Sequence, residues 1–151
     1  MAPRKLPNDA LITEILQKVS SAKTKKEKVD LLQEYNNNGL RSILIINFDE
    51  SLKFLLPEGD VPFNANEAPA GTDHTRLDHE YKGLYRYFKG GDSTIKSMKR
   101  EQLFVQLLEG LHKDEAELLI LACNKELQSK YRVTKAVVEQ AFPQIEWGNR
   151  G

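Results

Sequence analysis

The sequence predicts an all-α fold, a compact bundle of six to eight helices. Apolar residues recur at intervals of three and four along most of the chain, the spacing of one helical face. Residues that favour helix starts stand ahead of several such segments. A single β-branched run, Ile43–Ile46, could form a strand, but no run of similar quality exists to pair with it. We expect one helical domain over residues 1–143 and an irregular tail over 144–151.

Length and composition agree with a globular fold. The chain has 151 residues, of which 40% are hydrophobic and 29% charged, and 22 basic residues balance 22 acidic ones. A chain of this size buries roughly two-thirds of its unfolded surface, enough for a core without a metal or a disulfide. Cys123 is the only cysteine. No apolar run reaches the about 18 residues of a membrane span, so we expect no membrane insertion.

The first two helices are indicated by caps and apolar stripes. Asn8 or Asp9 is expected to cap the first, which carries Leu11 to Val19 on one face. Thr24 and Glu27 have the spacing of a capping box, in which each side chain accepts the other's backbone N–H. The run from Asn36 to Gly39 then predicts a helix stop.

The middle of the chain predicts a buried helix, then a loop. We interpret residues 40–56 as that helix followed by a short one beginning near Asp49 or Ser51. Residues 57–73 contain three prolines and two glycines, and they predict a long loop.

Helical spacing returns in the second half, over 77–88, 93–110, 112–123 and 134–142. The segment 112–123 is apolar nearly all round, so we expect it to be the central helix. Thr134 is expected to cap the last helix, and Pro143 to follow its end.

No residues form a recognisable catalytic or metal-binding pattern. His74 and His79 are five apart and fall on different helix faces, whereas histidine ligands on a helix favour a spacing of four. Cys123 lies in an apolar segment, as a core cysteine does. The acidic residues of the second half, Glu115 among them, are expected at helix ends or on a solvated face. We predict a protein that is not an enzyme and holds no metal or cofactor.

Basic residues gather in three groups around interhelical turns, where cations and backbone N–H groups can together hold phosphates. Ordinary solvated surface is the alternative, because acidic residues lie in each group and the net charge is zero. Each Lys or Arg would neutralise one phosphate. The Thr134 hydroxyl and the backbone N–H groups at the start of its helix would donate hydrogen bonds to another phosphate. The candidate residues are Lys23, Lys25 and Lys26; Lys96, Lys99 and Arg100; and Lys130, Arg132, Thr134 and Lys135.

The segment Leu118–Pro143, LLILACNKELQSKYRVTKAVVEQAFP, resembles the end of the N-terminal DNA-binding domain of ATP-dependent DNA ligases of T-even-type phages. That family has an apolar helix, an acidic–Leu pair, a tight turn, and a Ser/Thr-capped helix ending in an aromatic–Pro pair. The corresponding features here are Glu126-Leu127, Gln128–Val133, Thr134, and Phe142-Pro143. The resemblance implies a helical module that binds duplex DNA.

The chain departs from the ligases in two ways. It contains no Lys-x-Asp-Gly motif, which carries the adenylated lysine, so we expect no ligase activity. Lys130, Tyr131 and Arg132 fill the last turn, where ligases often have a glycine. The chain also resembles small proteins of T-even-like phages of marine bacteria, through Pro3–Asp9, Leu56–Pro62 and Gly71–Thr75. That likeness implies the cytoplasm of an infected bacterium, or the virion, as its location.

Two functions follow as hypotheses. The first is a non-catalytic phage accessory protein that binds duplex DNA by its phosphates without reading sequence. The second is a structural or protein-interaction adaptor for a phage or host protein, with a contact made by the apolar residues Phe142, Ile145 and Trp147.

Overall fold

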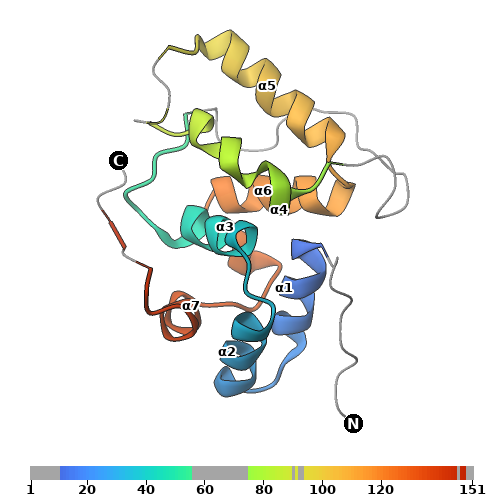
Figure 1. The fold of residues 1–151 in the computed structure, drawn as a ribbon, viewed down its shortest axis with the longest axis vertical. Helices are drawn as coiled ribbons and strands as arrows, with labels where there is room; N and C mark the ends of the chain where they lie inside the picture. The colour runs from blue at the N-terminus through green and yellow to red at the C-terminus, as the bar shows by residue number, and fades with distance from the viewer. Residues whose placement is uncertain (1–10, 56–74, 90, 92–93, 146, 149–151) are drawn as a thin grey trace.

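The computed structural model describes residues 11–55, 75–89, 91, 94–145 and 147–148, and this part of the chain is mostly helical (Figure 1). The all-α prediction is confirmed. The expected loop at 57–73 lies outside the described residues. The α-helices are α1 (Ile12–Ser21), α2 (Lys25–Glu34), α3 (Asn38–Phe48), α4 (Leu77–Glu80), α5 (Ser97–Gly110), α6 (Lys113–Cys123) and α7 (Lys135–Ala141), with 3-10 helices η1 (Tyr81–Tyr87) and η2 (Leu127–Ser129).

Helix α6 is the centre of the molecule, as its apolar sequence predicts. It packs against α1, α3 and α5, and its side chains Ala116, Leu118, Leu119 and Ala122 are fully buried. Cys123 closes the helix, is 6% exposed, and has the pKa of its thiol raised by burial. The core is therefore built around one helix that is apolar on most of its sides.

The helices are distributed along the long axis of the molecule. In Figure 1, α5 lies at one end, α2 and α7 lie at the other, and α3 and α6 lie between them. Helix α2 packs against both α1 and α7, which brings the first and last parts of the chain together. None of the helices that the structure describes has the length and hydrophobicity needed to cross a lipid bilayer.

The helix starts differ from the sequence prediction in detail. Helix α1 begins at Ile12 with Leu11 as its N-cap, and the Glu14 carboxylate accepts the Leu11 N–H at 2.9 Å. Asn8 and Asp9, the expected caps, lie outside the described residues. Thr24 caps α2 as predicted, but Glu27 accepts the N–H of Lys23 rather than that of Thr24. The capping box is thus only half formed.

The segment after α3 corrects another expectation. In the described stretch up to residue 55, no second helix begins near Asp49 or Ser51. The Asp49 carboxylate instead accepts both the N–H and the hydroxyl of Ser51, at 2.9 and 2.6 Å, which forms a tight turn. The chain then extends, and Phe54 forms an isolated antiparallel bridge with Phe88. The hydrogen bonds between Asp49 and Ser51 therefore form a turn where we expected the start of a second helix.

The end of α6 is held to the end of α3 by a lysine. Lys125 has a left-handed backbone (φ 59°) and donates its N–H to Ala122 O, while Glu126 N–H reaches Leu121 O. This is a Schellman ending with a lysine in the position that glycine usually takes. The Lys125 ammonium donates to the carbonyls of Ile46 and Asp49, each at 2.8 Å. One side chain therefore satisfies two acceptors at the end of the neighbouring helix.

Candidate nucleic-acid interface

A basic groove separates α1 and the α1–α2 turn from the connection between η2 and α7. Its volume is about 830 Å3. Of the described residues, four with cationic side chains and one carboxylate line it, together with hydroxyl and amide side chains. The lining residues are Thr13, Gln17, Ser20, Ser21, Ala22, Lys23, Lys28, Asp114, Lys130, Tyr131 and Arg132.

The two walls of the basic groove are joined through the main chain of Arg132. Its N–H donates to the Ser20 hydroxyl at 2.9 Å, and its carbonyl accepts from the Lys28 ammonium at 2.6 Å. These contacts join residues 112 and 104 positions apart in the sequence. Because the main chain of Arg132 is held on both sides, its exposed side chain starts from a fixed point on the groove wall.

The electrostatics of the basic groove favour an anion. Lys23 and Arg132 are exposed, and Asp114 is the only acid among the described residues that line the groove. Lys130 pairs with Glu117 at 3.1 Å, but both side chains are well exposed, at 42% and 54%. An exposed pair of this kind contributes little and exchanges readily with another ion. Cations and hydroxyl donors facing one hollow match the chemistry of a phosphodiester backbone.

The structure brings two of the three predicted basic groups together. Lys23 from the first group and Lys130 and Arg132 from the third line the same basic groove. Lys25 and Lys26 are exposed in the first turn of α2, beside that groove but outside its lining. The convergence depends on the packing of α2 on α7, which no local sequence pattern specifies.

The second group lies elsewhere. Lys96 and Lys99 are exposed at the start of α5, at the opposite end of the molecule from α2 and α7 (Figure 1). Arg100 is only 8% exposed, and its guanidinium donates to the carbonyls of Arg86 and Ile95, at 2.9 and 3.0 Å. The expectation that Arg100 faces a phosphate is corrected: its side chain is used to hold η1 against α5.

The remaining candidates at the C-terminal end have structural partners. The Thr134 hydroxyl accepts the Val137 N–H at 3.3 Å and caps α7. The Lys135 ammonium lies 5.1 Å from the centre of the Trp147 ring and does not line the basic groove. Thr134 therefore acts as the predicted cap, and Lys135 is directed toward the tail.

The apolar residues of the adaptor hypothesis are packed against the core. Phe142 is 1% exposed, and Ile145 and Trp147 are partly buried against core residues. The N–H of Gly148 donates to the Asp49 carboxylate at 3.1 Å, which holds the tail beside the end of α3. Phe142 is thus corrected from a surface contact to a core residue.

Sequence reasoning missed Lys28 and Ser20 as the residues that close the basic groove. The apolar pattern places both correctly, Ser20 in the last turn of α1 and Lys28 in the first part of α2. Their partner, however, is the backbone of a residue more than a hundred positions away. A serine at a helix end beside a lysine-rich turn is the only local signal, and it does not identify that partner.

No metal centre is visible in the part of the chain that the structure covers, since no three His, Cys, Asp or Glu residues there gather around one point. His79 lies 3.8 Å from Asp78, and His74 lies outside the described residues. The chain matches no curated protein and no solved structure. The model of DUF6433, a family of unknown function, matches residues 15–129, from the first helix to η2. The chain therefore belongs to the DUF6433 family.

Proposed function

We propose that this protein binds duplex DNA through the phosphate backbone, without reading base sequence, and that it does so as a non-catalytic accessory protein. The observation that carries the proposal is the basic groove. Two basic groups far apart in the chain meet in it, and the Ser20 hydroxyl, which accepts the Arg132 N–H, lies between them. Phosphate contacts of this kind give affinity that does not depend on sequence.

The zero net charge of the chain is compatible with this proposal. Electrostatic attraction to DNA depends on where the charges lie, and four cations face the basic groove against one carboxylate among the described residues. The DNA ligase resemblance points to the same ligand, and the phage resemblance suggests the cytoplasm of an infected bacterium or the virion as the location. Neither resemblance is needed for the argument from the groove.

The adaptor hypothesis has lost one of the three contact residues that motivated it. Phe142 is part of the core, and Ile145 and Trp147 are packed against it. We therefore prefer DNA to a protein partner as the ligand.

Binding of a 20-base-pair duplex of arbitrary sequence, measured by fluorescence anisotropy at several salt concentrations, tests the proposal. We expect binding at about 50 mM salt, with affinity that falls linearly on a log–log plot as salt rises. The double variant Lys23→Gln/Arg132→Gln should bind roughly tenfold more weakly or worse, and its salt slope should shrink by about 0.9 for each phosphate that the protein no longer neutralises.

The matched control is Lys96→Gln/Lys99→Gln. It removes the same charge from the start of α5, away from the basic groove. We expect it to bind almost as wild type does, whereas an equal loss in both variants would indicate attraction to overall charge. No binding by the wild type at about 50 mM salt would reject DNA as the ligand.

A further inference from the structure

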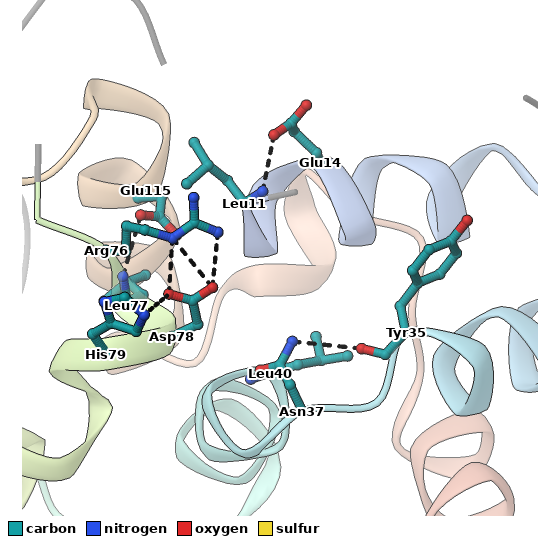
Figure 2. A network of polar contacts seen from close by, with 10 residues as sticks. All are labelled: Leu11, Glu14, Tyr35, Asn37, Leu40, Arg76, Leu77, Asp78, His79 and Glu115. Atoms are coloured by element: carbon teal, nitrogen blue, oxygen red, sulfur yellow. Dashed lines mark hydrogen bonds and ion pairs between the residues drawn. The ribbon is translucent and has the colours of Figure 1, made fainter. Parts of the chain in front are cut away.

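Glu115 is a carboxylic acid inside the core. It lies in the first turn of α6 and is 0% exposed, which corrects the expectation of a solvated acid. One carboxyl oxygen accepts the N–H of Leu77, the first residue of α4, at 3.2 Å (Figure 2). The N–H of Ile12, the first residue of α1, also points to this carboxyl group. A single side chain therefore joins the starts of three helices, and we call this contact the Glu115 joint.

The second carboxyl oxygen of Glu115 is buried and has no hydrogen-bond partner among the residues that the structure describes. A buried polar atom without a hydrogen-bond partner destabilises the folded state, and the destabilisation is far greater when the carboxyl group is ionised. On its other side the start of α4 packs closely against α3, because a Cβ on Gly39 of α3 would lie 2.7 Å from the Asp78 Cα. The starts of α4 and α6 are thus held together around a group whose charge the core does not accommodate.

The charged groups around the Glu115 joint do not compensate an ionised carboxylate. Arg76 is the cation beside it, but its guanidinium is bonded to Asp78 at 2.8 Å, and that carboxylate repels Glu115 (Figure 2). From α1, the Glu14 carboxylate is turned to the Leu11 N–H.

Further titratable and charged groups lie on the elements around the joint, and the first is His112, the N-cap of α6, which lies 3.8 Å from the Asp114 carboxylate. His79 faces the outer side of Asp78 at 3.8 Å, and Asp114, next to Glu115 in α6, lines the basic groove. In α3, Arg41 is the one charged residue, and it donates to Asn38. Little positive charge is therefore available to offset the solvation that the Glu115 carboxylate loses on burial.

We propose that the Glu115 joint is a proton-operated contact: the neutral acid keeps the start of α4 seated against α1 and α6, and ionisation draws water into the joint and loosens that seat. Burial, the largest cause, and the Asp78 carboxylate together raise the pKa of Glu115 to about 7. The change in protonation accordingly falls near neutral pH. The Glu115 joint borders the basic groove through Asp114, yet the proposal does not depend on what that groove binds.

Amide hydrogen exchange on the full chain, followed by NMR between pH 5.5 and 8.5, tests the proposal. After correction for intrinsic exchange, we expect the protection of the Leu77 amide to fall about 30-fold across this range. That factor follows from a carboxyl pKa of about 7 when closed and 4.5 when open. In Glu115→Gln, which keeps the shape and stays neutral, the protection should be constant.

Two further variants keep the proposal falsifiable. Glu101→Gln removes an exposed acid from α5, and it should show the wild-type fall in protection. Asp78→Asn removes the repelling charge, so the midpoint of the transition should move to lower pH. The proposal is overturned if Glu115→Gln keeps the pH dependence, or if the protection of Leu77 in the wild type does not change.

Discussion

The two ends of α6 each place a charged side chain against main-chain groups of a neighbouring helix, with opposite results. Beyond the C-terminal end, the Lys125 ammonium donates to two carbonyls at the end of α3. Near the N-terminal end, the Glu115 carboxyl group accepts the first N–H of α4, and its other oxygen finds no partner in the described part of the chain. Lys125 is partly exposed, whereas Glu115 is entirely buried.

The difference shows what determines whether a charge stabilises a helix junction. Burial lowers the pKa of Lys125 from its usual value, but the two carbonyl acceptors bind the ammonium form, so these bonds stabilise the fold while the side chain is charged. A buried carboxylate with one unsatisfied oxygen favours its neutral form instead. The first contact acts over a wide range of pH, and the second depends on a proton.

The largest expected effect comes from Glu115→Gln. The native pKa of about 7 lies above the unfolded value of 4.5, so the native state holds a proton that the unfolded state has released. Stability is therefore lost as pH rises from 4.5 through 7, and by pH 8 the loss amounts to about 3 kcal/mol. Urea unfolding should show the variant more stable than wild type by about this amount at pH 8, and equal to it at pH 4. A constant difference across this range would contradict the prediction.

Lys125→Met should have the next largest effect, in the opposite direction. It keeps most of the length of the side chain but removes the ammonium that donates to the carbonyls of Ile46 and Asp49, two buried residues. We expect a loss of about 2 kcal/mol in the free energy of unfolding. Urea unfolding at pH 5.5 and 7.5 should give the same loss, because the contact does not depend on the Glu115 proton. A loss that changes with pH in this range would mean that the two ends of α6 are coupled.

The smallest expected effect comes from a pair of variants that distinguishes the contribution of the Lys125 backbone conformation to stability from that of its side chain. Lys125→Gly and Lys125→Ala both remove the ammonium, but only glycine adopts φ 59° without strain. The glycine variant should therefore be more stable than the alanine variant by about 1 kcal/mol in thermal or urea unfolding. Equal stabilities would show that the Schellman ending rearranges once the lysine is gone.

Local patterns predicted the helices because caps and apolar spacing act within a few residues. Thr24 and Thr134 cap helices as expected, and α6 is central because apolar residues lie on most of its sides. The same logic failed after Asp49, where side-chain bonds to Ser51 form a turn in place of a further helix. Short-range competition of this kind leaves little trace in apolar spacing.

The site depended on long-range packing and was predicted only in part. Lys23 and Arg132 were found from charge grouping, but only the packing of α2 on α7 brings them to one groove. Charge grouping also selected Arg100, because the sequence does not distinguish an arginine that donates to main-chain carbonyls from an arginine exposed on the surface. Glu115 was misplaced for the same reason. An acid in the first turn of a helix is usually solvated, and only the positions of α1 and α4 bury this one.

The buried thiol of Cys123 gives the protein an intrinsic reporter of its own opening. It is the sole cysteine of the chain, and it closes the central helix with 6% of its surface accessible. Alkylating reagents attack the thiolate, which the folded protein suppresses by raising the thiol pKa. The rate of alkylation at increasing urea therefore measures how often the core is breached. Every variant described above can be ranked in this way without an added label.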